Sequence, residues 1–135
     1  MGLRERRAAK QYQDNTYPAL KARIDAAYGK PLEVEVDWGS LATDGQAHLY
    51  EDGFTKVYFE TLIGVLEAIA IDDMGREALH EGLKKVVVCN HSGKSNYRGF
   101  TFADGVFTID HKPTTNMDNI KERVEGATTM LEDAL

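Results

Sequence analysis

The sequence predicts a two-layer α+β domain, in which helices cover one face of a mostly antiparallel sheet of four or five strands. Two observations lead to this fold class. Apolar residues alternate over residues 32–38 and around a turn at 104–105, which is typical of strands with one buried face. Elsewhere they recur every three or four residues, as in amphipathic helices. The expected order is α-β-α-α-β-β-β-α within one domain, 1–135, and residues 1–13 are expected to form a frayed or separate N-terminal helix.

The first well-defined helix is expected to begin near Asn15 or Thr16, either of which can cap a helix N-terminus. Pro18 falls in the first turn, where its missing N–H group costs no hydrogen bond. Gly29 follows the last apolar position and is a typical helix end.

The segment 32–38 is expected to be a strand that divides its side chains between two faces. The apolar residues point one way, and Glu33, Glu35 and Asp37 point the other. Three carboxylates on one face could bind a basic partner or a cation. Adjacent outward positions are about 7 Å apart, however, so a solvated sheet face is the favoured interpretation. Residues 47–51 are expected to add a short strand.

Residues 54–71 are apolar on most sides and predict the central buried helix. Asp72 or Asp73 can cap a short helix that ends at Gly82. A final helix, capped by Thr115 or Asn116, is expected to close over the sheet.

Residues 84–90 predict a buried strand, and the hairpin that follows turns at Asp104-Gly105, a pair suited to a type I′ turn. This turn sets Phe102 opposite Phe107 and Thr101 opposite Thr108, so the turn and the apolar pattern agree on register. A short connection from the buried strand to the hairpin predicts an antiparallel meander.

The most reactive-looking stretch is Val86–Phe100. Its Gly-Lys-Ser at 93–95 does not make a phosphate-binding P-loop, because Val88 occupies the required glycine position and a strand follows. Cys89 and His91 are two residues apart and could share a strand face, but a buried thiol is favoured over a nucleophile. The sequence contains none of the common zinc or hydrolase motifs, so no catalytic residue, metal or cofactor is predicted.

The expected topology gathers polar residues at one edge of the sheet, close to the start of the last helix. Helix N-termini carry partial positive charge, so this rim is a candidate site for an anion or an acidic partner. A polar rim with no ligand is the favoured alternative, since sheet rims are generally polar. The candidate rim residues are His91, Ser92, Lys94, Arg98 and His111.

The net charge of −6 disfavours nucleic-acid binding, although Arg4, Arg6, Arg7 and Lys10 form a local exception. A single cysteine and the absence of a signal-like or membrane-spanning segment favour a cytoplasmic protein. We therefore expect a non-enzymatic protein-interaction module, such as an inhibitor, immunity-type or adaptor protein, whose partner is another protein or, in a homodimer, itself. The alternative is a small-molecule anion-binding domain or enzyme that uses the basic rim at 91–98 and 111.

Overall fold

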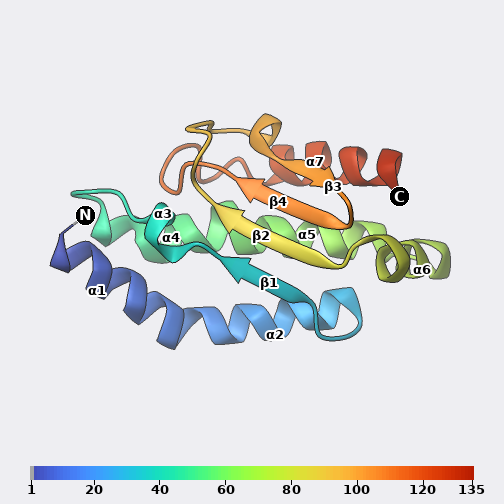
Figure 1. Cartoon of the computed structure of the whole chain (residues 1–135), viewed down its shortest axis with the longest axis horizontal. Coiled ribbons are helices and arrows are strands. Elements are labelled where there is room, and N and C mark those ends of the chain that lie inside the picture. The colour runs from blue at the N-terminus through green and yellow to red at the C-terminus, as the bar shows by residue number, and fades with distance from the viewer. Residues whose placement is uncertain (1) are drawn as a thin grey trace.

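The computed structural model describes residues 2–135, in which helices lie behind a four-stranded sheet (Figure 1). The main helices are α1 (Leu3–Gln11), α2 (Tyr17–Tyr28), α4 (Tyr50–Phe54), α5 (Glu60–Ile69), α6 (Asp73–Gly82) and α7 (Ile120–Ala134), with a single turn, α3 (Trp38–Leu41). The strands are β1 (Glu33–Val36), β2 (Lys85–Cys89), β3 (Thr101–Ala103) and β4 (Val106–Asp110). Among the described residues, no helix has both the length and the apolar character needed to cross a membrane.

The strand order is β1-β2-β4-β3, and the sheet is mixed. β2 pairs in parallel with both β1 and β4, whereas only β3 and β4 are antiparallel. The predicted antiparallel meander is therefore wrong. A short connection from β2 to a neighbouring strand was expected. Residues 90–100 instead cross the end of β4 and lead to β3, which lies two strand spacings, about 10 Å, from β2. β2 has valines on both faces and gains a neighbour on each side.

The hairpin prediction is confirmed in both turn and register. Asp104 and Gly105 have φ angles of 54° and 79°, the two positive values that a type I′ turn requires. Thr101 pairs with Thr108 and Phe102 pairs with Phe107.

The predicted short strand at 47–51 is wrong, because these residues form the 3₁₀ turn η2 (Ala47–Leu49) and the start of α4. Helical spacing brings the ring of Tyr50 onto that of Phe54, with 4.6 Å between centroids, and both side chains are buried. The last helix begins at Ile120 instead of near residue 115, because Asn116 takes a left-handed conformation (φ 54°) that a helix cannot contain.

Two π-helical turns join the helices of the first half of the chain. The turn η1 (Tyr12–Thr16) connects α1 to α2, and η3 (Thr55–Phe59) connects α4 to α5. The two turns meet where the Tyr12 hydroxyl lies 2.7 Å from Thr55 Oγ1. The N-terminal segment, expected to be a frayed or separate helix, thus runs on into α2.

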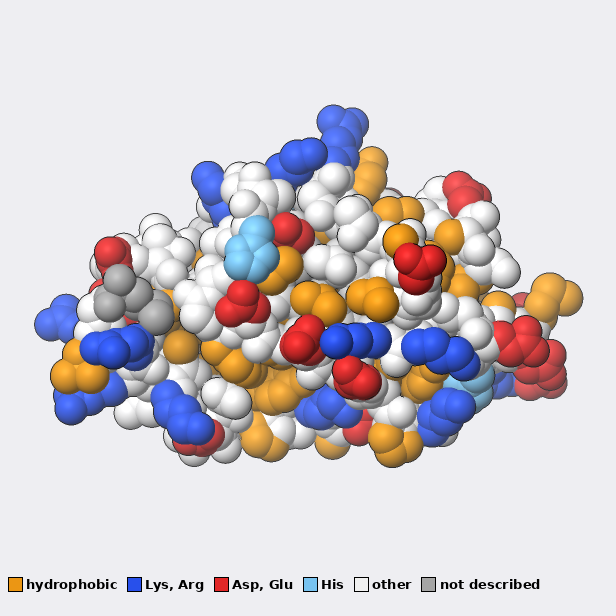
Figure 2. Space-filling model, in the orientation of Figure 1, with side chains coloured by type: hydrophobic (Ala, Val, Ile, Leu, Met, Phe, Trp, Pro, Cys, Tyr) orange, Lys and Arg blue, Asp and Glu red, His pale blue; other side chains and the backbone are white. Residues whose placement is uncertain are grey.

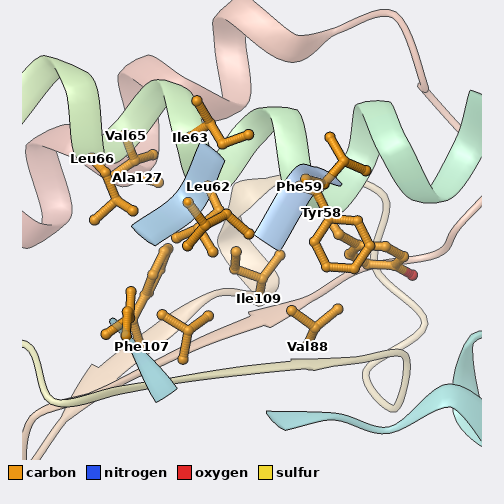
Figure 3. Packing of buried hydrophobic residues seen from close by; sticks show 14 of the residues in the cluster. Tyr58, Phe59, Leu62, Ile63, Val65, Leu66, Val88, Phe107, Ile109 and Ala127 are labelled. Atoms are coloured by element: carbon orange, nitrogen blue, oxygen red, sulfur yellow. The ribbon is translucent and has the colours of Figure 1, made fainter. Parts of the chain in front are cut away.

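The core lies between the sheet and the helix η3–α5, as the apolar run at 54–71 predicts. Leu62 points from α5 toward Ile109 of β4 and Val88 of β2 (Figure 3). All three side chains are fully buried. Two predicted helix signals are also confirmed: Asp72 Oδ1 accepts a hydrogen bond from the Gly75 N–H at 2.8 Å, and Gly29 ends α2 with φ 96°. The predicted cap at Asn15 or Thr16 is not formed, because α2 continues from η1 and the Thr16 hydroxyl donates to Glu51 instead.

The strand order can be tested by cross-linking on the uncovered sheet face. In a Cys89→Ser background, Val87→Cys with Thr108→Cys should form a disulfide, because these residues are parallel-register partners about 5 Å apart. Val87→Cys with Thr101→Cys should not, since Thr101 lies one strand farther away. Mass spectrometry after mild oxidation measures both, and the reverse result would place β3 beside β2.

Candidate functional site

The helices cover one face of the sheet, and the opposite face is open to solvent. The view in Figure 2 looks onto this face, where hydrophobic side chains lie among acidic and basic ones. Alternate residues of each strand point outward, and burial alternates along the strands except at the end of β2, where Cys89 is buried at an outward position. The open face comprises Glu33, Glu35, Asp37, Lys85, Val87, Val106, Thr108, Asp110, Thr101 and Ala103.

The acidic residues of β1 point outward as predicted, but two of them share a lysine. Lys85 Nζ lies 3.3 Å from Glu33 Oε2 and 3.2 Å from Glu35 Oε2. The parallel register sets Lys85 directly beside Glu33. Hydrogen bonds to the two carboxylates raise the pKa of the lysine ammonium group. The geometry of β1 alone holds the Glu33 and Glu35 carboxylates apart, but Lys85 of the neighbouring strand β2 brings both to one ammonium group.

The carboxyl ends of the three parallel strands form a second part of this face. His91 Nε2 lies 3.0 Å from Asp37 Oδ2, which joins the segments after β2 and β1. Asp110 at the end of β4 accepts hydrogen bonds from the backbone N–H groups of His91 and Ser92, at 2.8 and 2.9 Å. A shallow cleft of about 380 Å³ lies here, lined by Glu35, Val36, Asp37, Val87, Cys89 and His91.

Cys89 lies at this cleft but has the environment of a structural thiol. Its side chain is only 4% exposed, and the parallel register places it beside Asp110. Burial and the negative charge of Asp110 raise the pKa of the thiol to about 11. A nucleophilic cysteine needs the opposite shift, because the thiolate is the reactive form. The environment thus favours the buried-thiol interpretation.

The predicted rim residues do gather at one sheet edge, but their side chains do not converge. His91, Ser92, Lys94 and Arg98 are exposed, whereas His111 is fully buried beneath them. The cleft that His91 lines contains none of the other four. Asp37 and Asp110 also place two carboxylates at this edge, which lowers its attraction for anions.

His111 instead belongs to the buried support of the edge. Its backbone carbonyl accepts a hydrogen bond from the Tyr58 hydroxyl at 2.5 Å, and its Nδ1 lies 2.5 Å from the Lys112 carbonyl oxygen. Burial lowers the pKa of the imidazole, and the positive charge of Arg123 lowers it further.

A second cavity, of about 270 Å³, lies between the 95–97 segment and the beginning of α7. We call it the loop–helix cavity. Its lining residues are Ser95, Asn96, Tyr97, Asn116, Asn119, Glu122 and Arg123. Sequence reasoning placed the 91–98 loop near this helix end, but it did not single out Arg123. A signal was present, since Arg123, Ala127 and Leu131 repeat every four residues and all three are buried.

No protein-family model matches the sequence, and neither a curated protein nor a solved structure is significantly similar to the chain. Within residues 2–135, no three His, Cys, Asp or Glu side chains are grouped so that they could hold a metal ion.

The buried imidazole of His111 predicts a specific loss of stability in mild acid. As pH falls below about 6.5, the unfolded chain takes up a proton at this residue before the native protein does. The free energy of unfolding should therefore fall by up to about 1.4 kcal/mol per pH unit between the unfolded and native pKa values. His111→Phe keeps an aromatic ring and should lack this component in urea unfolding at pH 5–7. Parallel pH profiles for the two proteins would contradict the assignment.

Proposed function

We propose that this protein is a non-enzymatic protein-interaction module, of the inhibitor, immunity or adaptor type, that binds a basic partner with its open sheet face. The observation that carries the proposal is the one-sided sheet. All the main helices pack against or beside one face of the sheet, and the strands present hydrophobic and charged side chains on the other (Figures 1 and 2). An open sheet face with apolar side chains at its centre is a suitable docking surface.

The centre of the open face can supply contact area. Val87, Val106 and Thr108 are half-buried neighbours on the two central strands, and Thr101 extends the surface to β3. Methyl and hydroxyl groups of this kind can lie against a partner without leaving a buried charge unpaired. They offer packing, whereas the charges around them decide which partner fits.

The charges on this face favour a partner with basic side chains. Glu33, Glu35, Asp37 and Asp110 contribute four carboxylates, and Lys85 contributes one ammonium group. A second copy packed face to face would oppose two acidic surfaces, and like charges brought together cost binding energy. Lysine or arginine side chains would instead complement the acidic β1 edge and accelerate association.

The anion-binding alternative at the predicted rim has less support. Of its candidates His91, Ser92, Lys94, Arg98 and His111, the last is buried, and His91 is paired with Asp37. A catalytic role for Cys89 is likewise disfavoured by its raised thiol pKa.

The proposal is tested by nuclear magnetic resonance titration with a peptide of alternating lysine and valine residues. Backbone shifts should change at Glu35, Val87 and Thr108, and Glu33→Gln with Glu35→Gln should weaken binding roughly tenfold, because unpaired Lys85 would then repel the peptide.

Glu77→Gln with Glu81→Gln is the matched control, since it removes the same charge from exposed positions of α6. It should leave peptide affinity nearly unchanged. Equal weakening by both double variants, or shifts confined to another surface, would contradict a role for the open face.

A further inference from the structure

We propose that the loop–helix cavity binds a small carboxylate ligand that also carries an ammonium or hydroxyl donor, and that Arg123 recognises its carboxylate. This site lies apart from the cleft on the open sheet face: the two sets of lining residues share no member. The proposal does not rest on the protein-interaction function.

The first support is a buried positive charge without a paired carboxylate. The side chain of Arg123 is 2% exposed, and within the described chain its guanidinium forms no ion pair closer than 4 Å. Glu122 and Asp118 act on its charge, but both are exposed, and Asp118 is bound to Lys56 at 2.8 Å. Buried charges are normally paired, because desolvation without a counter-charge is costly.

The hydrogen bonds that Arg123 makes within the protein leave one of its guanidinium N–H donors available. Its Nε donates to Thr61 Oγ1 at 3.1 Å, and Nη1 donates to the Asn116 carbonyl at 2.6 Å. Nη2 donates to the carbonyls of Lys56 and Met117, at 3.2 and 2.8 Å. A guanidinium has five N–H groups, so these four neutral acceptors leave one Nη1 proton for another acceptor. A carboxylate would supply both that acceptor and the missing negative charge.

The other walls of the cavity suit the same ligand. Asn119 precedes the 15-residue helix α7 and makes no side-chain capping bond, so the first N–H groups of the helix are left uncapped. Asn96 and Asn116 line the cavity as well. Asn96 Oδ1 already accepts from the Arg98 N–H, and Asn116 Nδ2 donates to the Ser95 carbonyl, so the Asn96 Nδ2 and Asn116 Oδ1 atoms remain for a ligand. The Tyr97 ring packs on α7 at Gly126, where a Cβ atom would come within 2.6 Å of the ring.

Glu122 narrows the class of ligand. This exposed residue also lines the cavity, and its negative charge would repel a simple anion beside Arg123. A ligand with a carboxylate at one end and a hydrogen-bond donor at the other would satisfy both side chains. Small amino acids and hydroxy acids share this chemistry, and a cavity of about 270 Å³ restricts the site to small molecules of this type.

The experiment is a nuclear magnetic resonance titration of the full chain with L-serine, lactate and serinamide. Serine carries both an ammonium and a hydroxyl donor, lactate carries the hydroxyl donor alone, and serinamide lacks the carboxylate. At least one of the two acids should produce saturable shifts at residues 95–97 and 119–123, with a dissociation constant on the order of 1 mM. Serinamide should bind at least tenfold more weakly.

Asn119→Asp is the informative variant, because aspartate is also a good N-cap and should keep or increase the stability of α7. Its charge should repel the carboxylate and weaken binding at least tenfold. Asn15→Asp adds the same charge at an exposed position outside the cavity and should bind as the parent does. The proposal is overturned if neither acid gives saturable shifts at the cavity, if serinamide binds as well as serine, or if Asn119→Asp binds normally.

Discussion

The packing of the η3–α5 helix against the inner faces of β2 and β4 is the contact on which the rest of the structure depends. Tyr58, Leu62 and Leu66 are fully buried on this helix, and Val88 and Ile109 meet them from the sheet (Figure 3). Because α2 and α7 flank α5 on the same side of the sheet, these helices together cover the apolar face of the strands. The other face of the sheet is left open to solvent, where Glu33 and Glu35 pair with Lys85.

A second constraint acts at the carboxyl edge of the sheet, where polar groups hold the long connections. Asp110 fixes the loop after β2 through two backbone N–H groups, and Arg123 fixes the loop before α7 through the carbonyls of Asn116 and Met117. The π turn η3 contributes the Lys56 carbonyl to the same guanidinium. Both the open-face cleft and the loop–helix cavity therefore lie against loops whose shape is set by hydrogen bonds.

Local signals in the sequence were sufficient for much of the fold. The cap at Asp72, the helix end at Gly29 and the Asp104-Gly105 turn are each decided by a few neighbouring residues, and the structure has all three. The strand order was not accessible in this way, because it depends on how far residues 90–100 reach. The late start of α7 also required the left-handed conformation of Asn116, which only the folded loop reveals.

In the candidate sites, too, local features could be predicted from the sequence, whereas features that depend on tertiary neighbours could not. The alternation that puts Glu33 and Glu35 outward was readable from the strand, whereas their shared contact with Lys85 needed the parallel pairing of β1 with β2. Spacing places both His111 and Arg123 in buried series, His111 after Phe107 and Ile109, and Arg123 before Ala127 and Leu131. Neither was expected to be buried, since a buried polar side chain is the exception to sequence-based expectations.

The central claim is that one sheet face is covered by the protein's own helices and the other is available to a partner. Methyl nuclear magnetic resonance with a soluble paramagnetic agent tests it most directly. In the isolated protein the agent should strongly broaden the methyl signals of Val87, Val106 and Thr108, and should leave those of Val86, Val88 and Ile109 largely intact. Equal protection of both sets at low protein concentration would show that the second face is already covered, and would contradict the account.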